Sequence, residues 1–171
     1  MDSAGLEPRP ASASRTTLSQ VMSLLDTNLL GTVHGGVVMK LVDEAAGVVA
    51  TRHSGGPAVT AAMDEMVFVT PVRVGDLVHV HAQVNWTGRT SMEVGVRAVA
   101  ERWDRADEEP MRVATAYLAF VAVDGTGNPR PVPPVLPETD DELRRWREAE
   151  IRRRHRLARR EEIRSSREAG R

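Results

Sequence analysis

The sequence predicts an α+β protein in which a long antiparallel β-sheet curves around one mostly apolar helix. Two patterns carry this prediction. Residues 36–53 have the apolar periodicity of a helix that is buried almost all round. Four long strand-like stretches joined by short loops follow it, which favours an antiparallel meander. The chain has 171 residues, which is the size of one domain.

The segments up to the helix differ in composition. Residues 1–14 are rich in proline, serine and alanine without periodicity, which indicates a disordered tail. Residues 15–27 mix β-branched and apolar residues and are expected to contain a first strand. The stretch LLGTVHGG (29–36) contains three glycines and indicates a loop. The helix is then expected from about Gly36 to His53, where SGGP ends it.

The segments after the helix complete the domain and extend it. Strands are predicted at residues 58–69, 77–86, 91–103 and 111–124, so that one domain covers residues 15–125. Residues 126–137 hold five of the ten prolines and indicate an extended linker. Residues 138–171 are expected to form an arginine-rich helix with Thr139 as its N-cap, too polar to belong to a core.

The composition excludes several classes of protein. There are no cysteines, which excludes disulfides and thiolate chemistry. No apolar run approaches the roughly 20 residues that span a bilayer, and no apolar region of a secretory signal is visible at the N-terminus, so we expect a cytoplasmic protein. The formal net charge is −1, but residues 144–171 carry 12 Arg against 5 Glu. This excess admits nucleic-acid binding, although the interspersed acids and the scarcity of aromatics favour a solvated helix or a contact between subunits.

One acidic residue, Asp43, lies in the middle of the apolar helix. The residues beside it are small and leave space next to its carboxylate. Seven residues earlier, the pair Gly35–Gly36 places unpaired N–H groups at the helix N-terminus, where the helix dipole favours developing negative charge. A carboxylate base with backbone oxyanion donors is what acyl transfer to water requires. The alternative is a surface aspartate paired with Lys40 or an arginine.

An ordered set of motifs resembles a known family. The stretches NLLGTVHGGVVMKLVDEAAGVVATRH, AVTAAMDEMVFVTPVRVGD, TGRTSMEV, AYLAFVAVD and PVPPVLPETDDE are similar to hotdog-fold acyl-CoA thioesterases of the cytosolic, or brain acyl-CoA hydrolase, type, over roughly residues 20–145. The resemblance implies the hotdog fold and hydrolysis of acyl-CoA to a free acid and CoA. It also implies homodimers that assemble as a trimer of dimers. We expect no metal and no cofactor, because CoA is part of the substrate.

The resemblance implies an active site at a dimer interface. Asp43 matches the acidic position on the central helix, and Asn28 matches an asparagine contributed by the other subunit. Asp43 would activate a water or attack the thioester to give a mixed anhydride, and both routes remain open. The thioester oxygen would point at the N–H of Gly36, with or without that of Gly35. Asn28 would position the water or the thioester, whereas without the resemblance it is a turn residue.

The turn TGRTS is the best candidate for binding the nucleotide end of CoA. Arg89 could pair with a phosphate, and Thr90 and Ser91 could donate hydrogen bonds. A polar hairpin turn with a solvated arginine explains the same residues. Arg52 is a weaker candidate, because an arginine also suits the C-terminus of the helix.

Five further positions carry ionisable side chains or lie beside the predicted site. His34 lines the site or orders the loop before the helix, and the segment that contains Thr70 and Pro71 is expected to line the site. His79 and His81 share one face of a strand. Because further metal ligands cannot be assigned to them, a structural role is favoured for both.

A non-catalytic acyl-CoA sensor on the same fold is the main alternative function. It would keep a CoA pocket without needing a base, so the presence of both Asp43 and Asn28 argues for the enzyme. Hotdog dehydratases use a histidine as base, and an aspartate at the helix position argues against dehydration.

Overall fold

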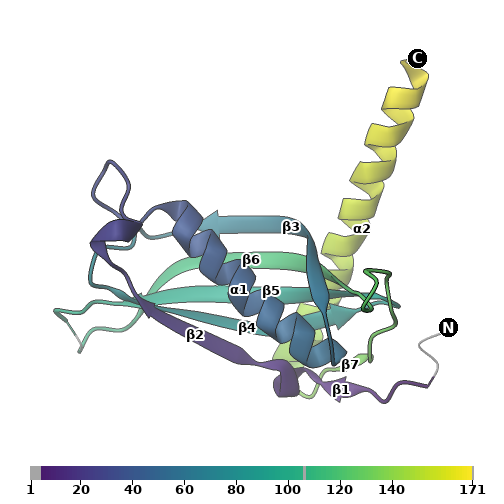
Figure 1. The fold of residues 1–171 in the computed structure, drawn as a ribbon, viewed down its shortest axis with the longest axis horizontal. Helices are drawn as coiled ribbons and strands as arrows, with labels where there is room; N and C mark the ends of the chain where they lie inside the picture. Colours follow the sequence, from purple (N-terminus) through teal and green to yellow (C-terminus); the bar gives the residue numbers. More distant parts are fainter. Residues whose placement is uncertain (1–4, 106, 171) are drawn as a thin grey trace.

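The computed structural model describes residues 5–105 and 107–170, and it has the predicted α+β hotdog architecture (Figure 1). Helix α1 (Gly35–Ser54) lies along one face of an antiparallel sheet. Within the described residues this sheet has five strands in the order β2-β4-β5-β6-β3. Their bounds are Thr16–Val21 for β2, Ala58–Phe68 for β3, Leu77–Thr87 for β4, Ser91–Glu101 for β5 and Met111–Ala122 for β6.

The sequence of α1 explains where the helix begins, ends and packs. His34 is its N-cap, and Gly55 ends it in the left-handed conformation, at φ 71°. Its inner face is apolar and packs against alternate residues of the strands. Burying each valine or leucine of this face stabilises the fold by about 1.5–3 kcal/mol. The buried apolar residues of the helix are Val38, Leu41, Val42, Ala45, Ala46, Val49 and Ala50.

The prediction that α1 is buried almost all round is wrong for a single chain. The sheet covers one side of the helix, and the opposite strip faces solvent. Met39 and Val48 on this strip are 42% and 41% exposed. Asp43 belongs to the same exposed strip. The apolar pattern of the helix therefore exceeds what one sheet can cover.

The strand predictions are confirmed with small changes at the ends. The strand expected within residues 15–27 stops at Val21, and a 3-10 turn (Leu24–Asp26) follows it. Ser23 and Asp26 form a capping box there, which closes the turn and ends the extended conformation. At the sheet edge, β6 is the single described partner of β3, and the register of this pair shifts twice.

Part of the predicted N-terminal tail is ordered, so the prediction is wrong for residues 9–14; residues 1–4 lie outside the described part. Strand β1 (Arg9–Pro10) pairs in parallel with β7 (Val135–Leu136). A 3-10 turn (Ala11–Ser14) then buries Ala11 and Ser14. The Arg9 guanidinium donates to the carbonyl of His53 at 2.8 Å and to that of Arg52 at 3.2 Å. Arg9 thus caps the C-terminus of α1, a role that sequence composition could not indicate.

The proline-rich segment at residues 126–137 is extended, as predicted, but it is packed and does not act as a free linker. Val132 is fully buried and Val135 nearly so. The Val132 N–H donates to the carbonyl of Arg89 at 3.0 Å, and the Val135 N–H donates to Thr87 Oγ1 at 2.9 Å. The segment therefore belongs to the hotdog domain.

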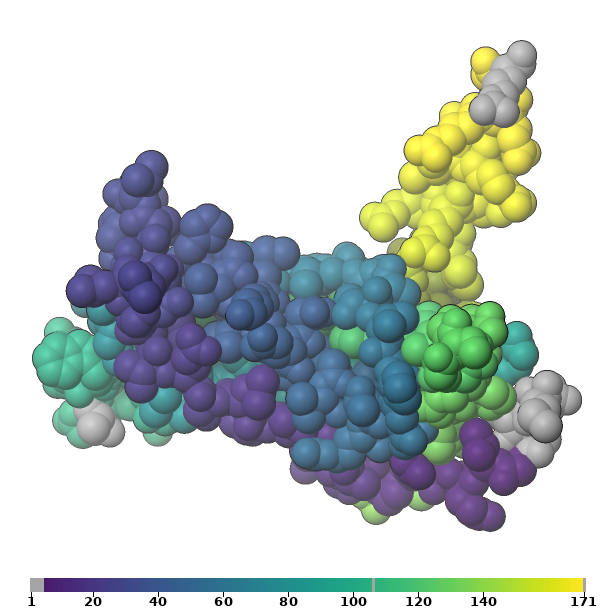
Figure 2. Space-filling view, viewed as in Figure 1, coloured from purple at the N-terminus to yellow at the C-terminus, as the bar shows by residue number. Residues whose placement is uncertain are grey.

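Helix α2 (Asp140–Ala169) begins at Thr139, whose hydroxyl accepts from the Glu142 N–H at 3.2 Å, as predicted. Its first half packs on the face of the sheet opposite α1, whereas its second half projects from the domain (Figures 1 and 2). From Leu157 to Ala169 every described side chain is exposed. No helix in the described ranges is long and apolar enough to cross a membrane.

Candidate active site

Asp43 lies at the middle of α1 and is held by a residue that the sequence did not single out. Thr60, on the edge strand β3, donates from its hydroxyl to Asp43 Oδ1 at 2.7 Å. No described residue donates to the other carboxylate oxygen, Oδ2. The available signal was that Thr60 is the one polar side chain in the apolar stretch AVTAAM. The alternative of an ion pair with Lys40 does not occur, because Lys40 pairs with Glu44, at 3.7 Å.

The two predicted oxyanion donors at the N-terminus of α1, the N–H groups of Gly35 and Gly36, differ in whether they already have a hydrogen-bond acceptor. The Gly36 N–H donates to Nδ1 of its own neighbour His34, at 2.9 Å. The Gly35 N–H donates to no group in the described part of the chain. The ring of Phe68 lies over Gly35, 3.5 Å from the position that a Cβ would occupy. Gly35 thus has an N–H without an acceptor among the described residues, and the Phe68 ring lies on the side where a Cβ would stand.

His34 orders the loop before the helix and caps it. Its N–H donates to the Asp26 carbonyl at 2.7 Å, while its ring accepts from Gly36. The Ser23 hydroxyl donates to the Asp26 carboxylate and lowers the pKa of that group. Thr70 and Pro71 lie close to this end of the helix, because the adjacent Val72 accepts through its carbonyl from the Val33 N–H at 2.9 Å. The predicted site lining and the glycine pair therefore share one end of α1.

Asn28 organises its own loop in this structure. Its Oδ1 accepts from the N–H of Leu30 at 2.8 Å and from that of Thr32 at 3.3 Å. Its Nδ2 donates to Thr32 Oγ1 at 2.9 Å. These bonds hold the loop in a turn whose neighbouring leucines point outward: Leu29 is fully exposed and Leu30 is 87% exposed.

The predicted CoA-binding residues lie at the other end of α1. Arg89 and Thr90 lie in the β4–β5 turn, and Ser91 begins β5. The carbonyl of Arg89 accepts from the Val132 N–H, and that of Thr90 accepts from the Ala122 N–H. The Arg89 side chain is exposed. Arg52, the weaker candidate, donates from Nη1 to the carbonyl of Arg15 and to Thr16 Oγ1, both at 2.8 Å, and its role in CoA binding stays a prediction. These bonds tie the helix end to β2.

One chain does not bring the predicted groups together around a single reacting atom. At 1.5 Å per residue, the helix is about 30 Å long, and Asp43 stands about 10 Å along its axis from Gly36. A thioester carbonyl that touched the helix N-terminus could not also touch Asp43 of the same chain. Arg89 lies still further away, beyond the C-terminus of the helix. Within one chain, the predicted catalytic and CoA-binding residues therefore lie apart along α1.

A broad apolar surface surrounds these residues. It comprises the turn before α1, the outer strip of α1 and the edge strand β3, and such a surface on a single chain marks an interaction site. Strand β3 has an unpaired edge, which in a stable protein is covered or paired. The exposed apolar side chains of the whole surface are Leu24, Leu25, Leu29, Leu30, Met39, Val48, Val59, Val67, Phe68 and Val69.

A single helix laid on a five-stranded antiparallel sheet, with a carboxylate at mid-helix and glycines at its start, defines a hotdog domain. The chain belongs to the thioesterase superfamily, whose family model matches residues 30–103. This confirms the family predicted from the motifs.

Named relatives support the same family. Over 146 residues the chain is 37% identical to the cytosolic acyl coenzyme A thioester hydrolase of Mus musculus, covering 85% of the chain but only 38% of that relative. The chain thus spans well under half of the mouse protein.

Two solved structures match over nearly their whole length. The acyl-CoA hydrolase of Staphylococcus aureus in complex with butyryl coenzyme A, coenzyme A and coenzyme A disulfide is 34% identical, with a TM-score of 0.84 and coverage of 92% of this chain and 95% of that one. An apo-hexameric acyl-CoA thioesterase is 37% identical, with a TM-score of 0.86 and coverage of 90% and 97%.

Proposed function

We propose that the protein hydrolyses acyl-CoA thioesters to a carboxylic acid and CoA, with Asp43 as the general base or the nucleophile. The observation that carries the proposal is the Thr60–Asp43 hydrogen bond on the open strip of α1. It fixes Oδ1 and leaves Oδ2 free to take a proton from water or to attack a carbonyl. The family, and the acyl-CoA ligands of the Staphylococcus aureus neighbour, indicate the substrate class.

The reaction would take place between two subunits. A thioester lying beside Asp43 of one subunit would direct its carbonyl oxygen to the Gly35 N–H of the partner subunit, which has no internal acceptor. The Gly36 N–H could contribute only if the His34 ring turned away. Donors aimed at the developing oxyanion stabilise the tetrahedral intermediate, and the helix dipole adds to them. The sulfur of CoA then leaves as a thiol after protonation, and water supplies the second oxygen of the acid, so no cofactor is needed.

Asn28 and the β4–β5 turn would complete the site. Asn28 of the partner subunit would orient the water or the thioester with the amide hydrogen that its Thr32 bond leaves unused. Arg89, Thr90 and Ser91 remain the proposed contacts for the nucleotide end of CoA, with Arg89 as the phosphate ligand.

A homodimer would cover the apolar surface described above and pair the edge of β3. Self-association through the same patch on both copies is the commonest closed arrangement. The hexameric neighbour supports a further assembly into a trimer of dimers. Each dimer would then contain two equivalent sites.

The test is thiol release from acyl-CoA of increasing chain length, with single-site variants. Asp43→Ala is expected to lower kcat about a hundredfold or more while the protein stays folded. Glu44→Ala, which removes the adjacent exposed carboxylate of the same helix, is the matched control and should retain activity. Thr60→Val is expected to lower kcat about tenfold, as one hydrogen bond to a charged group is lost.

The two subunit roles are separated by mixing variants. Asn28→Ala and Asp43→Ala chains are each expected to be nearly inactive, while mixed dimers regain up to half of the wild-type sites. Wild-type protein that binds acyl-CoA without releasing thiol would instead identify a non-catalytic sensor.

A further inference from the structure

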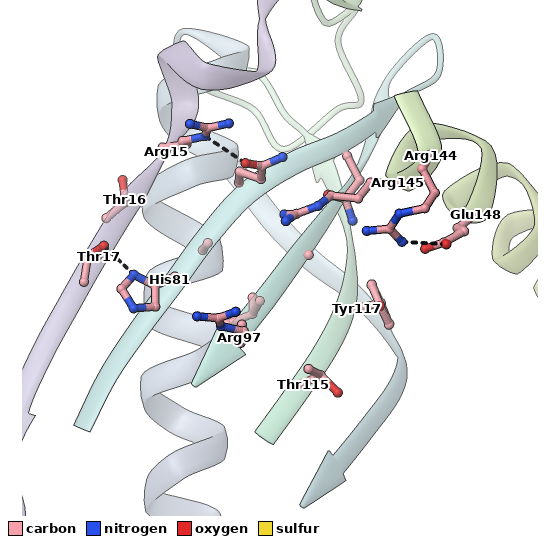
Figure 3. Close-up of a pocket in the computed structure, with 15 residues that line it drawn as sticks. Arg15, Thr16, Thr17, His81, Arg97, Thr115, Tyr117, Arg144, Arg145 and Glu148 are labelled. Atoms are coloured by element: carbon pink, nitrogen blue, oxygen red, sulfur yellow. Dashed lines mark hydrogen bonds and ion pairs between the residues drawn. The ribbon is translucent and has the colours of Figure 1, made fainter. Parts of the chain in front are cut away.

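Helix α2 crosses the outer face of the sheet, opposite α1, and reaches the edge strand β3. Its first turns, which carry Arg144, lie over the sheet (Figure 3). Further along the helix, Arg152 stacks on the Tyr117 ring of β6, and one turn later Arg156 pairs with Asp64 on β3. Residue 156 therefore marks the point where α2 reaches the edge of the domain.

The helix continues past this edge. No described strand lies beyond β3 in the sheet. Residues from Leu157 to Ala169 nevertheless remain helical, and at 1.5 Å per residue they extend about 20 Å from the domain (Figures 1 and 2). Isolated helical segments of this length are marginal in water, and a helix that is polar on all sides either bridges two packed bodies or depends on ion pairs along its surface. In this half, the one ion pair between described residues joins Glu161 and Arg164.

The side of α2 that faces the sheet continues into the projecting half. Arg152 and Arg156 face the strands and are four residues apart. Further steps of four, three and four residues keep to the same side of the helix and reach Arg160, Ile163 and Arg167. These three residues line one hollow, and Ile163 is 45% exposed. We call them the arm stripe, because they form a sheet-facing side without a sheet beneath it.

The outer face of β3 presents groups that suit the arm stripe. Asp64 has Arg156 as its partner, whereas the neighbouring Glu65 is exposed and makes no ion pair or hydrogen bond with a described residue. Glu65 lines a groove of about 370 Å³ between β3 and α2, together with Ile151, which is 45% exposed. The groove thus offers a carboxylate and an apolar side chain on the strand and helix that meet at the sheet edge.

A second copy of the chain would bring the two surfaces together. Pairing of β3 with β3 of the partner subunit would continue the sheet across its edge, with adjacent strands about 4.8 Å apart. The projecting half of α2, about 20 Å long, would then pass over the outer face of the partner subunit's β3 and of strands beyond it. A two-fold axis makes this contact reciprocal, so that each helix covers the other subunit.

We propose that the projecting half of α2 is a dimerisation arm that packs on the outer face of a second copy of this chain. Ile163 would lie against the apolar wall that Ile151 forms in the partner subunit's groove, and Arg160 and Arg167 would face the partner subunit's Glu65. Opposite charges across such a contact select its register and its partner. The proposal rests on the homodimer of the proposed function, and it adds a contact on the face of the sheet opposite Asp43.

The first test measures self-association of the full-length protein by sedimentation velocity over a dilution series. Ile163→Glu places a carboxylate on the arm stripe, and Ser165→Glu places the same charge on the opposite side of the same helical segment. Both side chains are exposed in one chain, so both variants are expected to fold. Ile163→Glu should raise the dissociation constant about tenfold or more, because a charge is buried at the contact. Ser165→Glu should associate as wild type does, and equal constants for the two variants overturn the proposal.

A charge exchange separates a contact between subunits from one within a chain. The distinction is needed because Arg159 of the same chain also lines the groove that contains Glu65. Glu65→Arg in one protein, and Arg160→Glu with Arg167→Glu in another, should each weaken self-association about tenfold, since every dimer then holds two like-charged contacts. In an equimolar mixture, the heterodimer pairs opposite charges at both contacts, so association should recover toward the wild-type value. A mixture that stays as weak as its components overturns the proposal.

Two further measurements keep this test separate from the hydrolase and from other partners. Asp43→Ala should self-associate as wild type does, so failure of the hydrolase proposal leaves the test intact. Hydrogen exchange of residues 157–169 should be slow in the assembled wild-type protein and fast in Ile163→Glu. A protein that stays monomeric, or free exchange of these residues in the assembly, overturns the proposal. So does weaker retention of the Arg160→Glu, Arg167→Glu protein on nucleic acid at unchanged self-association, which would assign the arginines to a polyanion.

Discussion

The two helices attach to opposite faces of one sheet by different physical means. Helix α1 packs through valine, leucine and alanine side chains that are almost fully buried. Helix α2 packs through only two apolar side chains, Trp146 and Ala149, and is otherwise attached by charged groups. Arg152 pairs with Glu93 and stacks on Tyr117, and Arg156 pairs with Asp64. The inner face of the sheet is accordingly apolar, and the outer face is polar.

This difference shows how one sheet can carry an apolar core on one face and a polar surface on the other. Apolar packing is indifferent to orientation and supplies most of the free energy of folding. Buried ion pairs add little net stability but require defined geometry, so they fix where α2 lies. The outer face can then keep polar side chains such as Asn85 without making the core polar.

The largest effect is expected in the core beneath α1. Leu41→Ala removes a 6% exposed side chain and should lower the free energy of unfolding by about 2–5 kcal/mol. Chemical denaturation monitored by circular dichroism measures this change. Lys40→Ala, at the neighbouring exposed position, is the control and should change it by less than about 0.5 kcal/mol. Equal effects of the two substitutions would contradict the assignment of the inner face.

A smaller and more local effect is expected at the ion pairs of α2. Arg152→Ala leaves the nearly buried Glu93 with a single remaining donor, Asn85. We expect a loss of about 2–3 kcal/mol, below the ~3–5 kcal/mol of a fully buried pair, because the Arg152 side chain is 18% exposed. Hydrogen exchange should show faster opening of α2 than of β5. Uniformly faster exchange over the whole sheet would argue against separate attachment of the helix.

The C-terminus of α1 makes stability depend on pH. Burial lowers the pKa of His53, against the opposing hydrogen bond to the Pro133 carbonyl. Below the ordinary value of 6.5 the unfolded chain takes up a proton that the folded chain resists, so stability present above pH 6.5 is lost as the pH falls. Denaturation of His53→Gln should show a flatter pH profile, and the exposed His155→Gln should follow wild type. An unchanged slope in His53→Gln would contradict this prediction.

The smallest effect is expected in the projecting half of α2. Arg164 and Glu161 pair at 2.7 Å, but their side chains are 67% and 61% exposed. Arg164→Ala should change the free energy of unfolding by less than about 0.5 kcal/mol, because solvent and salt screen such a pair. The measurement is the same denaturation as for Arg152→Ala. An effect as large as that of Arg152 would show that this pair is shielded from solvent.

Sequence reasoning predicted the sheet and both helices because their patterns are local. Period-two and 3.6-residue apolar repeats record which face of each element is buried. Besides the overestimated burial of α1, the errors concerned residues 9–14 and 126–137, whose composition suggests a chain without structure. They are ordered by long-range contacts, including the Arg9 cap on α1, which no local pattern records.

The site was predicted in part for the same reason. The motifs predict Asp43, Gly35 and Asn28 as site residues, but they do not indicate Thr60, which reaches Asp43 only because β3 lies beside α1. The sequence also contains no sign that Arg52 would bond to Thr16 at the start of β2, 36 positions away. The reach of α2 beyond β3 depends on where the sheet ends, which only a three-dimensional structure specifies.

The short parallel pairing of β1 with β7 has a consequence for how the chain folds. The hairpins of β4, β5 and β6 join neighbouring segments and can close early, whereas Arg9 meets Val135 only after nearly the whole domain has been brought together. During synthesis on the ribosome, the first residues of the domain must wait for its last ones. The strands in the middle of the sequence are therefore expected to fold first, and β1 and β7 are expected to pair last.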